Sequence, residues 1–555
     1  MNATMTLLVD LFGFLTVILR GLALVLTAGS VGGFVFRQVA VGSRLDAAQT
    51  DDVVARLAEL NYRTALALIA VMFLAGSLDL LILVTTIEVP WTTAISAPFM
   101  VADVVSCIAA TILALDSRRT APRLSTGRWL EWLAAATLIG SIVATTHAMG
   151  RLDGRLWLLG VSTLHQIGGA VWIGGLPSFL IVLAATIPGP VRAEIAHRYS
   201  HLCVWSVSAL FFSATAKYVA YIGVPEAIYG TAYGLMTATK AILFLALIGF
   251  GAGNYQAVRR MASSTHATLR THRFVEVELA IGIGVFFVAG SLTSLPPAVD
   301  LPLDRVAWAT IVERVLTVKT PRLISPEHSA LWYETERVRI ESLAADAREQ
   351  AVRTFVPGAG FIFDRSAADL AWSEYNHNWS GVFVLTIGIF AMLARFAGLR
   401  WARHWPVMFV ALGIFIAIRS DPETWPLGSI GFFESFRDPS ILQHRFMALL
   451  VMVFGIFEWR VRAGSLAGTR AAYVFPLTNL LGGILMFTHS HVLENIQEAL
   501  LIEMSHIPIG LLGIAAGCAR WLELRTESPI RERAGYFWPV AFAAIGLVLL
   551  FYRES

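Results

Sequence analysis

Imidazole and thioether side chains are concentrated in one short stretch near the end of the chain. The stretch from Met486 to His506 reads Met-Phe-Thr-His489-Ser-His491, then a short polar link, then Glu503-Met504-Ser-His506. Imidazole and thioether are donors that suit copper, and thioether favours Cu(I). These residue types therefore predict a copper site, provided that the fold brings them to one side of one membrane.

The composition indicates an all-α polytopic membrane protein. Of the 555 residues, 56% are hydrophobic and only 15% are charged, and the mean hydropathy is +0.66. Apolar runs of about twenty residues recur along the chain, and each is long enough to cross a bilayer as a helix. The net charge of +3 gives no indication of nucleic-acid binding. The three cysteines form no CxxC pair and predict no disulfide framework.

About fourteen transmembrane helices are predicted, in two groups. The first eight lie near 9–34, 63–86, 94–115, 129–148, 155–187, 200–222, 231–256 and 273–295. Six more lie near 378–396, 404–419, 441–460, 471–489, 499–521 and 535–552. The first run lacks a persuasive cleavage site, so we expect it to be retained as a helix. Three domains follow: eight transmembrane helices at 1–295, a polar segment at 296–376, and six transmembrane helices at 377–555.

Basic residues alternate between the two sides of the predicted helices. Clusters of arginine fill every second connection, among them those around Arg118, Arg259 and Arg520. Because positively charged loops stay in the cytoplasm, both termini are predicted to be extracytoplasmic, in a bacterial inner membrane. The polar segment then lies outside the membrane, where an amphipathic helix from about Glu327 to Arg353 is expected to cap the outer face.

Seven histidines fall in the outer half of the membrane by this topology. They are His147, His165, His377, His444, His489, His491 and His506. A single histidine at a helix end is often only a polar residue at the membrane surface, but five of these belong to the last six helices. They predict a second metal or haem site, with His444, His489 and His506 as preferred ligands and His377 and His491 as further candidates.

Charged side chains inside apolar helices form another candidate group. They are Arg20, Asp79, Asp103, Lys217 and Lys240. Such residues are costly in lipid and usually face the interior of a helix bundle. Two interpretations stay open: structural ion pairs between the aspartates and the lysines, or a path for a cation or a proton.

A run of motifs between 155 and 300 resembles a known family. The fifth predicted helix carries His165-Gln-Ile-Gly168-Gly169-Ala-Val-Trp172-Ile-Gly174-Gly175-Leu-Pro177, and later helices carry Arg198-Tyr-Ser, Tyr233-Gly234, Lys240, Asn254, Glu278 and Leu295-Pro296-Pro297. This order is similar to that of the copper resistance protein D (CopD) family of membrane proteins. The four preceding helices suit the same family, so 1–295 is expected to be a CopD-like domain. The resemblance implies copper handling at the inner membrane, with uptake towards the cytoplasm and His165 as a metal contact.

The chain departs from the family pattern in two respects. It has no Met-rich motif, and its last six helices lie beyond the common domain. Those helices are similar to C-terminal extensions of some CopD-like proteins, in the start His377-Asn-Trp-Ser-Gly and the step Gln443-His444-Arg445. The resemblance implies no function for the extension, so its role depends on its own residues.

Three functions remain open from the sequence. The first is a transporter whose His and Met side chains capture copper at the outer face. The second is an electron-transfer protein or reductase that binds haem b between facing histidines. The third is a factor that delivers copper to a respiratory enzyme, with that complex or a periplasmic copper-binding protein as partner. The chain has no P-loop, GxSxG or Rossmann motif, which argues against an ATP-driven pump and favours a transporter or metal-binding protein over an enzyme.

Overall fold

The structure is a computed structural model that divides the chain into two compact units. It describes residues 3–42, 45, 51–118, 128–316, 320–331, 343, 347, 367–396, 398–437, 439–488 and 496–553. The N-terminal unit consists of Phe14–Arg305, and the C-terminal unit of Val306–Ser555 together with Met1–Gly13. Both are helical: the described residues contain one isolated bridge, between Thr424 and Ile430, but no β-strand.

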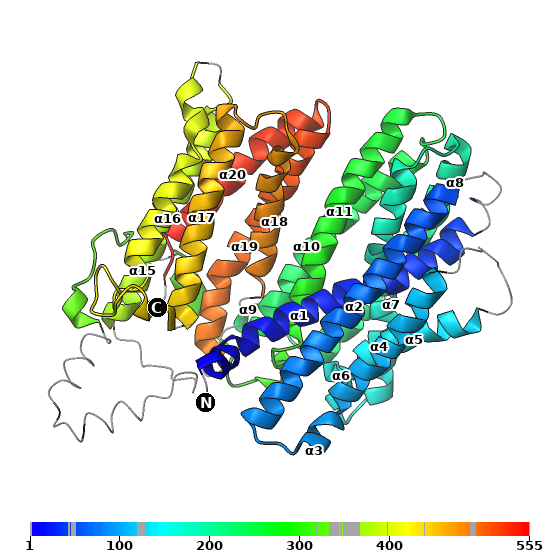
Figure 1. Ribbon diagram of the computed structural model, residues 1–555, viewed down its shortest axis with the longest axis horizontal. Helices are drawn as coiled ribbons and strands as arrows, with labels where there is room; N and C mark the ends of the chain where they lie inside the picture. The colour runs from blue at the N-terminus through cyan, green and yellow to red at the C-terminus, as the bar shows by residue number, and fades with distance from the viewer. Residues whose placement is uncertain are drawn as a thin grey trace. The chain divides into compact units, whose positions relative to one another are not determined.

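Long helices and short connecting turns make up the described part of the N-terminal unit. The long helices are α1 (Ala3–Val35, of which the part from Phe14 belongs here), α2 (Asp51–Thr85), α4 (Pro98–Ser117), α5 (Trp129–Ala144), α7 (Arg155–Ala184), α8 (Gly189–Tyr221), α10 (Ala232–Val258) and α11 (Thr265–Leu292). The turns include the π-helix η1 (Phe36–Val41), α3 (Trp91–Ile95), α6 (His147–Gly150), α9 (Glu226–Gly230) and η3 (Ala298–Asp300). Extensive contacts join α2 to α4, α7 to α8, and α10 to α11 (Figure 1).

Helices α1 and α7 approach each other so closely that only glycine fits at two positions. A Cβ on Gly174 would lie 1.8 Å from the carbonyl oxygen of Ala28, and a Cβ on Gly32 would lie 2.1 Å from that of Ala170. Both distances are far below van der Waals contact, so a side chain would force the helices apart. Small residues commonly allow such close contacts between membrane helices. The glycine-rich run of α7 therefore serves packing against α1. This packing sets the rotation of α7 and so the direction in which its other residues, among them His165, face.

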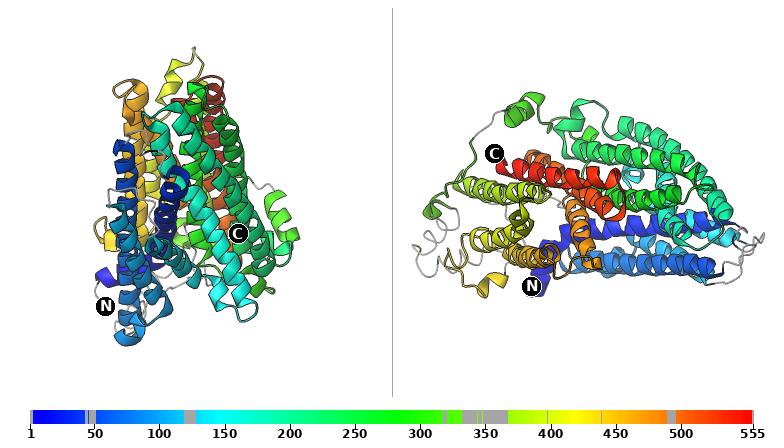
Figure 2. Two further views of the ribbon diagram at one scale, coloured as in Figure 1. Left: turned by 90° about the vertical axis from the view of Figure 1, so that its right-hand side faces the viewer. Right: turned by 90° about the horizontal axis from the view of Figure 1, so that it is seen from above.

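The C-terminal unit contains a second set of helices, several of which run side by side (Figures 1 and 2). Its elements are α12 (Trp308–Leu316), η4 (His328–Ala330), α15 (Ala367–Leu393), η5 (Arg400–His404), α16 (Val407–Arg419), η6 (Glu434–Arg437), α17 (Pro439–Ala463), η7 (Arg470–Tyr473), α18 (Val474–Leu485), α19 (Ile496–Arg525) and α20 (Ile530–Leu550). Helix α20 packs against α15 and α19, while α16 packs against α17. An aromatic core surrounds the guanidinium of Arg462, which lies 5.2 Å from the ring centre of Trp405 and 5.5 Å from that of Trp538.

Each of the fourteen predicted segments contains a helix. Among the described residues, ten helices are long and apolar enough to cross a membrane, and α5 and α16 are shorter apolar helices. This confirms the all-α class and supports a multi-pass membrane protein. Several helices begin earlier than predicted: α2 begins at Asp51 and α8 at Gly189, because hydrogen bonding along a helix continues past the end of its apolar run. Most of the predicted amphipathic helix at 327–353 lies outside the described residues.

Candidate functional site

A cavity of about 350 Å³ lies between the helices of the N-terminal unit. Side chains from α1, α2, α4, α5, α6, α7, α8, α10 and α11 line it. Aromatic and aliphatic groups form much of the wall, including Trp172, Phe244 and Phe286. A mostly apolar pocket with a few converging polar groups is the usual form of a site for a small ligand or an ion.

The charged groups and two of the histidines singled out in the sequence converge on this cavity. The lining includes Arg20, Asp79, Asp103, His147, His165, Lys217 and Lys240. Among the described residues, neither aspartate forms an ion pair with either lysine. Arg20 instead lies within electrostatic range of both aspartates. The interpretation of these groups as aspartate–lysine pairs is therefore not supported by the geometry, whereas their position on a shared cavity is compatible with a path.

One carboxylate of the cavity, that of Asp103, has a thioether in its neighbourhood. A Cβ placed on Gly76 of α2 would lie 3.5 Å from Oδ2 of Asp103 and 3.9 Å from Sδ of Met100. Met72, on α2, also lines the cavity. Neither methionine is among the site residues predicted from the sequence. The sequence spacing could nevertheless have indicated that Met100 lies near Asp103, because the two are three residues apart and share one face of α4.

His165 lies on α7 with hydrogen-bond partners at both ring nitrogens. Its Nδ1 is 2.9 Å from Oγ of Ser213, and its Nε2 is 3.4 Å from Nζ of Lys240. The Ser213 hydroxyl donates to the carbonyl of Ala209, so Nδ1–H of His165 donates to that hydroxyl and Nε2 accepts from Lys240. A metal could bind Nε2 only if Lys240 moved away. The metal contact that the resemblance implied at His165 stays a prediction.

His147 lies at the start of α6, where the cavity meets a second pocket of about 330 Å³. Its Nε2 is 3.2 Å from the carbonyl oxygen of Leu292; since a carbonyl only accepts, Nε2 carries the hydrogen. This arrangement leaves the lone pair of Nδ1 without a partner among the described residues. Metal-binding histidines commonly have one N–H fixed by a carbonyl in this way, with the other nitrogen facing the metal.

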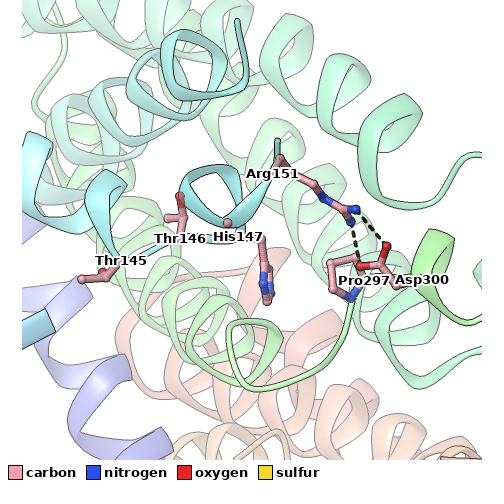
Figure 3. Close-up of a pocket in the computed structure, with 7 residues that line it drawn as sticks. Thr145, Thr146, His147, Arg151, Pro297 and Asp300 are labelled. Carbon is pink, nitrogen blue, oxygen red and sulfur yellow. Dashed lines mark hydrogen bonds and ion pairs between the residues drawn. The ribbon is translucent and has the colours of Figure 1, made fainter. Parts of the chain in front are cut away.

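The second pocket is held by an ion pair between the α6–α7 connection and η3. The guanidinium of Arg151 donates to both carboxylate oxygens of Asp300, at 2.8 Å each (Figure 3). Thr145, Thr146 and Pro297 complete much of the wall around His147. Burial lowers the pKa of His147 below its ordinary value of 6.5, although the Leu292 carbonyl opposes this shift. The imidazole is therefore neutral at neutral pH, as a metal ligand must be.

A buried hydrogen-bond network joins three motif residues from α7, α10 and α11. The carboxylate of Glu278 accepts from Nε1 of Trp172 and from Nδ2 of Asn254, both at 2.6 Å. Glu278 is only 3% exposed and Trp172 only 1% exposed. The hydroxyl of Tyr199, on α8, donates to the backbone carbonyl of Trp172. Residues that seemed to form a diffuse sequence pattern are thus partners in one contact between four helices.

The histidines of the C-terminal unit do not all have the same surroundings. His444 approaches Asp421, with Nδ1 2.6 Å from Oδ1. His377 stacks on Tyr552 at 3.9 Å between ring centres, and His506 meets the same ring edge-on at 6.3 Å. His489 and His491 lie outside the described residues. Among the described residues, no group of three His, Cys, Asp or Glu side chains could hold a metal, so the predicted second metal or haem site stays a prediction.

Comparison with known proteins places α8 to α11 in a family. Residues 193–292 match the family model of copper resistance protein D (CopD). The CopD segment holds Lys217, Lys240, Asn254 and Glu278, while His165 and Trp172 come before it. The resemblance inferred from the motifs is therefore confirmed for this segment.

A curated relative is similar to about a quarter of this chain. The copper transport protein CutJ of Bacillus subtilis (strain 168) is 26% identical over 136 residues, which is 24% of this chain and 24% of CutJ. The chain thus matches about a quarter of the length of that relative. No solved structure matches the chain.

Proposed function

We propose that this protein moves copper ions across the bacterial inner membrane through the cavity of its N-terminal unit. The observation that carries the proposal is His147, whose Nδ1 lone pair is available where the smaller pocket meets the cavity. The CopD match at 193–292 and the name of CutJ support copper as the cargo. Uptake towards the cytoplasm is the direction that the family resemblance implies.

The proposed route begins at the smaller pocket, which faces the extracytoplasmic side in the predicted topology. His147 captures the ion there through Nδ1. Inside the cavity, the carboxylates of Asp79 and Asp103 and the thioether of Met72 provide the next donors, and Met100 lies beside Gly76 close to Asp103. Imidazole, carboxylate and thioether together can bind a copper ion without a permanent tight site. A periplasmic copper-binding protein is the proposed source of the ion.

A test of this route compares copper accumulation in cells that express the wild type, His147→Ala or the control His201→Ala. His201 is exposed on α8, beside His197, and does not line the cavity. We expect His147→Ala to lower accumulation roughly tenfold or more, which is a common cost of disturbing a metal ligand. His201→Ala should match the wild type. Accumulation by His147→Ala that equals the wild type, at equal amounts of folded protein, would refute the route.

The role of the C-terminal unit is tested separately. We propose that His444, His489 and His506 contribute to a second copper site, with haem b as the alternative ligand of that unit. Purified wild type and the triple variant His444→Ala, His489→Ala, His506→Ala are compared for copper content and for visible absorption. Lower copper in the variant supports the copper site, and a Soret band in the wild type supports haem instead. Equal copper and no Soret band in either protein would contradict both.

A further inference from the structure

Lysine is rare in this chain, and two of its three lysines line the cavity. The sequence has three lysines among its 42 lysine and arginine residues, at positions 217, 240 and 319. Lys217 on α8 and Lys240 on α10 both line the cavity. Apart from Lys319, every other basic side chain among the lysines and arginines of the sequence is an arginine. Lys217 and Lys240 therefore differ from most basic residues of the chain both in residue type and in their position on the cavity wall.

The two lysines form a concentration of positive charge without a carboxylate partner. They lie within electrostatic range of each other and of His165. Lys240 contacts Nε2 of His165 at 3.4 Å, and no described residue forms an ion pair with either ammonium group. Arg20 lies near Asp79 and Asp103, so those carboxylates already have a cation beside them. Like charges that are partly buried in a low-dielectric interior repel each other, and a counter-charge between them relieves that repulsion.

The cavity that the lysines line also carries phenolic hydroxyls. Tyr218, Tyr221 and Tyr233 line the same cavity, and their hydroxyls donate to no other described residue. A phenolic O–H can donate a hydrogen bond to an anion. Lysine presents a compact point charge, whereas arginine presents a planar fork that matches carboxylate or phosphate. A pair of compact ammonium groups therefore suits a spherical, singly charged ligand.

We propose that the cavity binds a small monovalent anion, with chloride as the simplest case, between Lys217 and Lys240. The anion neutralises the lysine pair at the side of the cavity formed by α8 and α10. The aspartates occupy the side formed by α2 and α4, so the cavity has separate positions for an anion and for a cation. This proposal does not depend on copper transport, since the charges that require compensation belong to the protein itself.

The first test is the thermal stability of the purified full chain as chloride replaces gluconate at constant ionic strength and pH. A ligand that binds only the folded state raises stability with a saturable dependence on its concentration. We expect the wild type and the control Lys319→Gln to show this dependence. Lys217→Gln and Lys240→Gln should weaken apparent chloride affinity roughly ten- to hundredfold, the usual value of a hydrogen bond from a charged donor. A chloride response of wild-type strength in both variants would overturn the proposal.

The second test needs no variant, so it remains valid if the lysine variants fail to fold. Equilibrium dialysis of the wild-type protein with radioactive chloride measures binding directly. Saturable binding of about one chloride per chain, displaced by bromide, supports the site. If no saturable binding occurs, the lysine pair is compensated by loss of a proton instead, and the proposal is wrong. Copper accumulation is measured in neither test, so their failure leaves the proposed transport function unaffected.

Discussion

Replacement of Glu278 tests whether Trp172, Asn254 and Glu278 act as one buried network. In Glu278→Leu, the N–H of Trp172 and the amide of Asn254 lose their acceptor while they remain buried. Each buried donor left without a partner costs about 1–3 kcal/mol, so the two together cost roughly 2–6 kcal/mol of stability. This is a large share of the stability of an ordinary protein, for which the total is about 5–15 kcal/mol.

Glu278→Gln should be far milder, for a reason that the structure supplies. Oδ1 of Asn254 is buried and has no hydrogen-bond partner. After a flip of the Asn254 amide, that oxygen can accept from the new side-chain amide, whose own oxygen still accepts from Trp172. Both hydrogen bonds are kept, so we expect a loss of about 1 kcal/mol or less.

The assay is thermal or denaturant unfolding of the purified protein in one detergent. Glu59→Leu is the control, because Glu59 is exposed on α2 and forms a surface ion pair with Arg63. We expect the order of stability to be wild type, control and Glu278→Gln close together, with Glu278→Leu well below. If Glu278→Leu is as stable as the control, or Glu278→Gln is as damaging as Glu278→Leu, the account of this network is refuted.

Three further predictions concern the proposed copper path, the pKa of His147 and the membrane topology. Asp79→Asn or Asp103→Asn should abolish copper accumulation at unchanged amounts of folded protein; a loss of folded protein instead would indicate a structural role. The pKa of His147 is lowered by burial, so above pH 6.5 its imidazole is neutral in both folded and unfolded chains. Below pH 6.5 the unfolded chain binds the proton first, and the folded state loses stability. Between pH 7.5 and a pH below 6.5, His147→Gln should therefore lose less stability than the wild type loses over the same range. Equal losses of stability in the two proteins would contradict this. Reporter fusions at Ser555 and after Arg260 should lie on opposite sides of the membrane, and the same side for both would mean a miscounted helix.

Much of the helical architecture could be predicted from the sequence. Each predicted segment contains a helix because an apolar run of suitable length favours helix formation in a membrane whatever its neighbours are. The helix ends were less predictable: α2 begins twelve residues before its predicted start, since the polar residues at its beginning carry no hydropathy signal. The intramembrane charges were also identifiable from sequence, because they stand out in apolar surroundings.

The partners of those charges were decided only by the tertiary structure. The sequence placed Asp79 and Asp103 in apolar helices, but it did not distinguish Arg20 from the lysines as the neighbouring cation. Likewise, the family resemblance implied a metal contact at His165, whereas the fold gives both nitrogens of His165 hydrogen-bond partners. Spacing within one helix determines which residues share a face. Which faces meet depends on the rotation and crossing of different helices, and only packing around contacts such as that of Gly174 sets these.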